Sequence, residues 1–207
     1  MPGYYVHIAA ATDDLRSSIL GIKGVIAPDL WKKHTPTESE YHEFFRNCLN
    51  VPTYEQVKKL CLPEHGGTHF GSEAGDTNHA DFKLLETMFE NGEFDANNLF
   101  FKGYIHHLKV DYIFYSNPSI CDNVSFERDF AADSDKAMSD LHCDWDKTNY
   151  AISKWYPETK GIVSKMPEEV RKVINFVEGD CKYISLSPMK DFIEEMRKNR
   201  SLEELLK

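Results

Sequence analysis

The chain has 207 residues, of which 41% are hydrophobic and 28% are charged, a balance typical of a globular domain with a sizeable core. Its formal net charge of −10 disfavours nucleic acids and anionic membrane surfaces as partners, because no basic excess is present to neutralise phosphates. No stretch reaches the roughly 18 apolar residues of a membrane span, so no stable membrane anchoring is expected. The first residues lack the basic and apolar regions of a secretory signal, which favours a cytoplasmic protein.

Apolar periodicity predicts helices through most of the chain and no alternating strands. The predicted fold is therefore all-α, a multi-helix bundle forming one domain over residues 1–207. We expect loops at residues 21–30, which contain two glycines and a proline, and at residues 64–80, which are rich in Gly and His. Helices are expected at residues 4–20, 37–49, 53–61, 81–91, 97–117, 124–133, 134–155, 166–178, 188–198 and 202–207.

The helix predicted at residues 97–117 is aromatic and apolar, yet it carries polar side chains in its middle. His107 and Asp111 are four residues apart, so they project from one face of a helix, one turn apart. Such a pair is costly to bury unless it has a partner. A divalent metal is one such partner, and a simple His–Asp hydrogen bond or a solvated helix face is the alternative.

The helix predicted at residues 134–155 repeats this spacing with His142 and Asp146. Asn149 continues the same face, whereas Asp144 does not. Taken by itself, this second pattern is better explained by a solvated polar face. The five cysteines are scattered without a CxxC pair, which argues against both a disulfide framework and a thiolate metal site.

Three further residues are candidate ligands, each with an ordinary structural alternative. His7 lies in the first predicted helix and is also explained as a hydrogen-bonded core histidine. Asp29 is also explained as the N-cap of a short helix. His69 lies in the most apolar part of its loop and is the loop histidine expected to turn inward.

These residues together predict an internal metal site, because side chains on facing helices of a bundle can converge on metal ions. The candidate ligands offer only nitrogen and oxygen, a set that suits zinc and also manganese, iron or cobalt. They are His7, Asp29, His69, His107, Asp111, His142 and Asp146.

The order of the segments YYVHIAA, GVIAPD, GTHF, GYIHHLKVD and LHCDWD resembles the zinc-dependent phospholipase C family, which shares its fold with single-strand-specific zinc nucleases. The resemblance extends from about His7 to Asn149. It implies an all-α fold with one to three zinc ions. Asp29, His69, His107 and Asp111 would hold one ion, His7 and Asp111 a second, and His142 with Asp146 a third, with Asp where the family has Glu.

The chain departs from the family pattern at two points. The family uses a processed N-terminal Trp as a ligand, whereas this sequence starts Met1-Pro2-Gly3. The family also has a further His between its two helical motifs, and none lies here between His107 and His142. These departures leave the third metal position, and with it the number of ions, open.

The function expected from the resemblance is metal-dependent hydrolysis of a small phosphoester or phospholipid headgroup. Asp29 is the candidate to orient or deprotonate the attacking water. Residues expected to hydrogen-bond the ligands are His106, Glu64, Asp144 and Asn149. Two alternatives remain: a non-catalytic metal-binding helical protein with a degraded site, and an HD-type phosphohydrolase, although the chain contains no His-Asp dipeptide.

Overall fold

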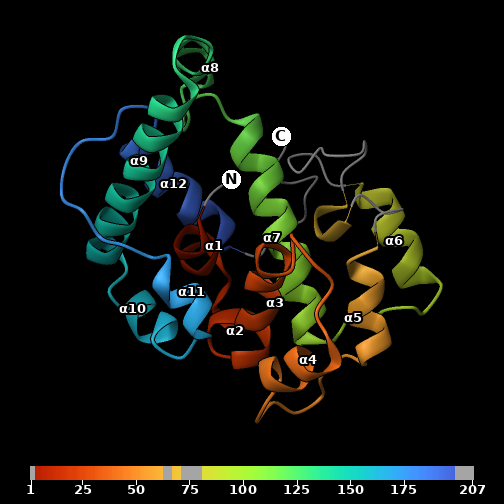
Figure 1. Ribbon diagram of the computed structural model, residues 1–207. Helices are drawn as coiled ribbons and strands as arrows, with labels where there is room; N and C mark the ends of the chain where they lie inside the picture. Colours follow the sequence, from red (N-terminus) through yellow and green to blue (C-terminus); the bar gives the residue numbers. More distant parts are fainter. Residues whose placement is uncertain (1–2, 63–66, 71–80, 199–207) are drawn as a thin grey trace. The chain divides into compact units, whose positions relative to one another are not determined.

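The computed structural model describes residues 3–62, 67–70 and 81–198 (Figure 1). Within these ranges the regular elements are helices, and β-type pairing is limited to an isolated bridge between Cys121 and Ile184. The all-α prediction is confirmed. None of the described helices combines the length and the apolar character needed to cross a bilayer.

The residues group into two compact units, which are described separately. The terminal unit comprises Met1–Ala10 and Ile113–Lys207, and the middle unit comprises Ala11–Tyr112. The prediction of one domain over residues 1–207 stays a prediction.

The terminal unit is built around a short buried N-terminal helix. This helix, α1, packs against α9, α10 and α12 (Figure 1). The helices of this unit are α1 (Tyr4–Ala10), α8 (Asn123–Ala132), α9 (Ser134–Trp155), α10 (Glu158–Val163), α11 (Glu168–Lys172) and α12 (Leu186–Met196).

The middle unit contains the rest of the helices. They are α2 (Asp13–Arg16), α3 (Ile19–Leu30), α4 (Glu38–Phe44), α5 (Tyr54–Leu60), the 3-10 turn η2 (Gly67–His69), α6 (Phe82–Glu90) and the greater part of α7 (Leu99–Ser116). Two of them begin with a capping box, in which Thr37 pairs with Glu40 and Thr53 with Gln56. Each box satisfies backbone N–H groups that a helix start otherwise leaves without an intrahelical acceptor.

The largest difference from the sequence prediction lies at residues 4–30. The predicted helix at residues 4–20 is divided into α1, α2 and the start of α3, and the predicted loop at residues 21–30 is helical as part of α3. Pro28 lies inside α3 and leaves the helix without one backbone donor, but it does not end it. The helix predicted at residues 166–178 is also shorter, because α11 ends at Lys172.

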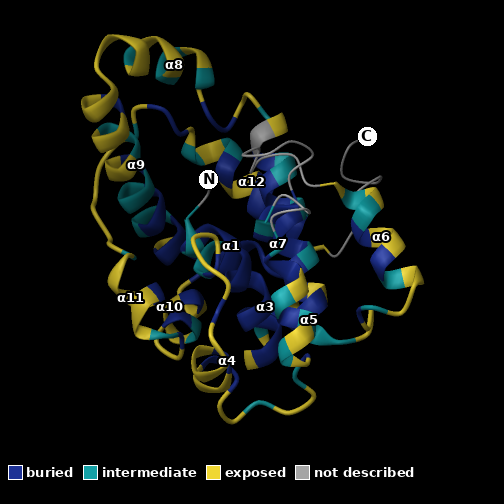
Figure 2. Ribbon diagram, turned by 45° about the vertical axis from the view of Figure 1, so that its right-hand side comes forward, coloured by how far each residue is buried: buried dark blue, intermediate teal, exposed yellow. Residues whose placement is uncertain are grey.

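Helix α3 is almost entirely buried, as Figure 2 shows. Its glycines make this burial possible, because they let a neighbouring helix pack closely against it. A Cβ atom added at Gly24 would lie 2.0 Å from the carbonyl oxygen of Phe100 in α7. A Cβ atom at Gly103 would lie 2.2 Å from the carbonyl oxygen of Gly21. The backbones of α3 and α7 therefore approach each other more closely than any residue with a side chain would allow.

Aromatic side chains fill the space beside this helix crossing. Trp31 at the end of α3 packs edge-on against Phe44, with 4.8 Å between ring centroids, and contacts Phe100 at 6.1 Å. Phe45 packs against Phe100 at 5.2 Å. All four side chains are buried. They link α3, α4 and α7 into one core, which holds the helix crossing in place.

Replacement of Gly103 by Ala is expected to lower the free energy of unfolding by about 1–3 kcal/mol, because the new methyl group overpacks the helix crossing. Gly161→Ala is the matched control, since Gly161 lies in α10 and a Cβ atom there meets nothing within 4 Å. That change is expected to be neutral or to stabilise by up to about 1 kcal/mol. Urea unfolding of both variants measures the difference, and equal stabilities would contradict the close crossing.

Candidate metal centre

Four polar side chains from three elements of the middle unit converge on one point. Asp29 comes from the last turn of α3, His69 from η2, and His107 and Asp111 from α7. The His69 and His107 side chains are 1% and 0% exposed, and those of Asp111 and Asp29 are 3% and 10% exposed. Asp29 is thus the member of the group nearest to solvent.

The two imidazoles meet through their Nε2 atoms, which lie 3.4 Å apart. Oδ2 of Asp111 is 3.4 Å from Nε2 of His69 and 3.3 Å from Nε2 of His107. Oδ1 of Asp29 is 3.4 Å and 3.9 Å from the same two nitrogens. Each carboxylate therefore lies within reach of both imidazoles.

These separations match the shell of a small tetrahedral cation. For zinc bonds of roughly 2.0–2.1 Å, neighbouring ligand atoms of a tetrahedron are about 3.3–3.4 Å apart. Four of the five distances given above are 3.3–3.4 Å, and the fifth, from Asp29 to His107, is 3.9 Å. These five separations and the donor types are compatible with a zinc-sized ion, and Asp29, His69 and His107 lie close enough together to share one.

A hydrogen bond at Nδ1 of His107 fixes which of its two ring nitrogens faces the other ligands. Nδ1 of His107 lies 2.7 Å from the backbone carbonyl oxygen of Val25 in α3. A carbonyl oxygen only accepts hydrogen bonds, so Nδ1 carries a proton and donates it. In the neutral imidazole Nε2 then presents a lone pair, which is the form that binds metal ions.

His69 is held in the same way through a hydroxyl group. The Thr68 hydroxyl donates to the carbonyl oxygen of Pro28 at 2.8 Å, and its oxygen lies 3.1 Å from Nδ1 of His69. Because the single hydroxyl proton is directed to Pro28, the oxygen accepts from Nδ1 of His69. Nε2 of His69 therefore also presents a lone pair when the ring is neutral.

Two inward lone pairs and two carboxylates repel one another unless a positive charge lies among them. A proton is one source of that charge. Burial opposes the charged form of His107, but the carboxylates of Asp111 and Asp29 outweigh it and raise the pKa of His107. A divalent cation is the other source, and its two positive charges would balance the two carboxylates while both imidazoles stay neutral.

The turn that carries His69 has an uncommon backbone. Gly67 and Phe70 both have positive φ, +67° and +50°, and Phe70 is fully buried. A positive φ is unfavourable for a bulky residue and is retained only where the surroundings require it. Tyr104 of α7 donates a hydrogen bond to the Thr68 carbonyl oxygen and fastens the turn beside His107.

The remaining predicted ligands belong to the terminal unit. His7 is fully buried in α1. His142 is exposed and Asp146 is half-buried on α9. Among the residues that the structure describes, neither His142 nor Asp146 belongs to a group of three or more side chains arranged to hold an ion. The geometry therefore gives no support to a metal position at these two residues.

The residues expected to hydrogen-bond the ligands lie in different parts of the chain. His106 is buried on α7, about 100° around the helix from His107. Asp144 is buried in α9, where its carboxylate accepts hydrogen bonds from the backbone N–H groups of Lys182 and Tyr183. Asn149 donates to the Asn175 carbonyl at 3.1 Å. Asp144 and Asn149 thus hold local backbone of their own unit, and Glu64 lies outside the described residues.

Sequence reasoning missed the groups that orient the imidazoles. The position of Thr68 directly before His69 is a usable signal, because Thr hydroxyls often bond to nearby polar groups. The Val25 carbonyl has no such signal, since its role depends on the contact between α3 and α7.

Comparisons with protein-family models, curated protein sequences and solved structures found no match to this chain.

Zinc added to metal-free protein is expected to bind at this group and to raise the melting temperature, because a ligand of the folded state at 100 times its dissociation constant adds about 2.7 kcal/mol. His69→Ala and His107→Ala should each lose one equivalent of zinc. His42→Ala is the control, since His42 is exposed on α4. Elemental mass spectrometry after gel filtration measures the uptake, and equal zinc content in His107→Ala and His42→Ala would contradict the site.

Proposed function

We propose that this protein is a metal-dependent hydrolase of small phosphoesters, with its reaction centre at Asp29, His69, His107 and Asp111. The observation that supports the proposal most directly is the convergence of two imidazole nitrogens and two carboxylate oxygens at 3.3–3.9 Å. The resemblance of its sequence segments to zinc-dependent phospholipase C points to the same class of reaction.

The donor set favours a catalytic over a structural ion. Structural zinc sites are dominated by cysteine thiolates, whereas hydrolytic sites use histidine and carboxylate. The chain has five cysteines, and none belongs to this group. Zinc is the ion proposed, and the same donors accept manganese, iron or cobalt.

A bound divalent ion would supply the activation of water and the neutralisation of phosphoryl oxygens on which such hydrolysis depends. The protein itself holds the ligands and the attacking water in position, and it transfers the proton. His69 and His107 are fixed by Thr68 and by the Val25 carbonyl, so they bind without reorganisation. The carboxylate of Asp29 is the most exposed of the group and is proposed to orient water and to accept its proton.

Lys32 supplies a positive charge beside the group. It lies three residues after Asp29, just past the end of α3, is exposed, and interacts electrostatically with the carboxylates of Asp29 and Asp111. An ammonium group at this edge attracts a phosphate monoanion or dianion. In a chain with a net charge of −10, this local positive charge would add to that of the bound ion in attracting a phosphorylated substrate.

A second candidate function is metal binding without catalysis. Four protein ligands fill a tetrahedral shell, and structural sites are closed in this way, whereas catalytic sites keep a position for water. Hydrolysis therefore requires a fifth position or the withdrawal of one ligand. Asp29 is the ligand best placed to withdraw, because it is the most exposed and has the longest separation, 3.9 Å from His107.

Hydrolysis of bis(p-nitrophenyl) phosphate and p-nitrophenyl phosphate by the zinc-loaded protein tests the proposal and separates diesters from monoesters. Asp29→Asn at saturating zinc is expected to lower kcat by about 10²–10⁴-fold, the usual contribution of a general base. Asp191→Asn, at an exposed position of α12, is the matched control and should keep full activity.

The outcomes distinguish the two candidate functions. Suppose that the protein takes up zinc but hydrolyses neither ester faster than free zinc alone does. That result would support the non-catalytic alternative. Turnover that is unchanged in Asp29→Asn would place the reaction elsewhere in the chain.

A further inference from the structure

A buried lysine on α3 lies outside the candidate metal centre. Lys23 is only 7% exposed. Its Nζ donates a hydrogen bond to the Phe44 carbonyl oxygen at the end of α4 and lies 3.2 Å from Sγ of Cys48. The ring of Phe44 is 5.4 Å from the same nitrogen. Across the described residues, no carboxylate forms an ion pair with Lys23.

The ionisable side chain in contact with the Lys23 ammonium group is that of Cys48. A buried ammonium is costly unless it is paired and hydrogen-bonded. The Phe44 carbonyl satisfies one N–H group but carries no charge. The sulfur of Cys48 accepts a second hydrogen bond from the same nitrogen, and a neighbouring lysine is one of the features that distinguish reactive cysteines from inert buried ones.

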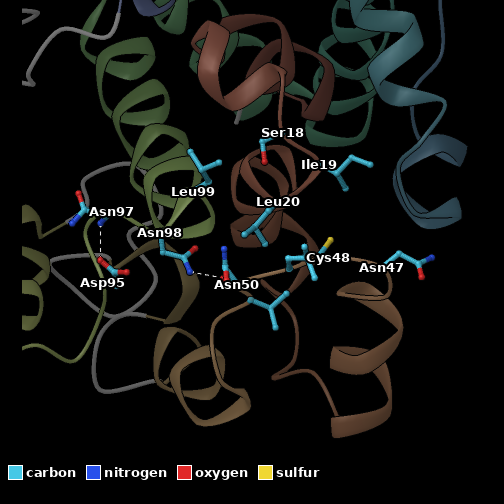
Figure 3. Close-up of a pocket in the computed structure, with 12 residues that line it drawn as sticks. Ser18, Ile19, Leu20, Asn47, Cys48, Asn50, Asp95, Asn97, Asn98 and Leu99 are labelled. Atoms are coloured by element: carbon cyan, nitrogen blue, oxygen red, sulfur yellow. Dashed lines mark hydrogen bonds between the residues drawn. The ribbon is translucent and has the colours of Figure 1, made fainter.

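The sulfur is also accessible. Cys48 is half-buried and lines a pocket of about 740 Å³, shown in Figure 3. Asn47 and Asn50 flank it with positive φ values of 63° and 55°, a backbone form that Asn tolerates better than most residues. Asn98 donates a hydrogen bond to the Asn50 carbonyl at 2.7 Å and holds this turn in place at the pocket.

We propose that Cys48 is a reactive, oxidant-sensitive thiol that Lys23 activates, and that its co-reactants are hydrogen peroxide and small soft electrophiles. With peroxide, the thiolate sulfur attacks one oxygen, so that an S–O bond forms and the O–O bond breaks. Hydroxide leaves, the sulfur is oxidised by two electrons to sulfenic acid, and the peroxide is reduced. The ammonium of Lys23 stays in place and stabilises the thiolate before the attack.

Cys143 provides an internal control within the same molecule, because it is exposed on α9 whereas Cys48 is half-buried. Exposure alone would make Cys143 the faster of the two. Brief alkylation of the native, full-length protein with iodoacetamide at pH 7, followed by peptide mass spectrometry, measures both rates. We expect Cys48 to react on the order of tenfold faster, since an ordinary thiol is only a few per cent thiolate at that pH.

Lys23→Met tests the role of the charge. With the fold verified by circular dichroism, this variant should label Cys48 no faster than Cys143. In the wild-type protein, hydrogen peroxide in the presence of dimedone should give the sulfenic acid adduct on Cys48 before Cys143.

Either of two results would overturn the proposal: equal or faster alkylation of Cys143 in the wild-type protein, or unchanged labelling of Cys48 in folded Lys23→Met. The wild-type comparison decides the matter even if the variant fails to fold.

Discussion

The candidate metal centre depends on the contact between the backbones of α3 and α7. Only glycine allows the approach, because a Cβ atom at Gly24 or Gly103 would overlap a carbonyl oxygen of the facing helix. The contact brings the Val25 carbonyl within 2.7 Å of Nδ1 of His107. It also places Asp29, one turn further along α3, beside the His107 imidazole. A wider crossing would remove both the orientation of the His107 imidazole and the second carboxylate of the group, that of Asp29.

The same contact explains why a third element completes the group. The Thr68 hydroxyl bonds to the carbonyl of Pro28 in the last turn of α3, where helix carbonyls lack intrahelical donors. That hydrogen bond fixes the turn that carries His69. Both imidazoles are therefore oriented by carbonyl groups of α3, one directly and one through a hydroxyl. Fixed outer hydrogen bonds of this kind are typical of histidines that bind metal ions.

Part of this arrangement can be predicted from sequence. The four-residue spacing of His107 and Asp111 places both on one helix face, and the apolar neighbours of His69 indicate that it turns inward. Spacing alone is insufficient, however, because His142 and Asp146 have the same spacing and His142 is exposed. What separates the two pairs is the packing around each helix, which local pattern does not encode.

The error at α3 has a related cause. Glycine and proline predict a loop when local propensity is the only guide. Here Gly21, Gly24 and Pro28 lie in a buried helix, because tertiary contact with α7 requires glycine at the crossing. The Val25 carbonyl that orients His107 was unpredictable for the same reason.

The most direct measurement is X-ray absorption at the zinc edge, on protein stripped by a chelator and reloaded with one equivalent of zinc. The proposed site predicts nitrogen and oxygen neighbours at roughly 2.0–2.1 Å, with outer scattering from two imidazole rings. Sulfur neighbours at about 2.3 Å, or the absence of imidazole scattering, would contradict a centre formed by Asp29, His69, His107 and Asp111.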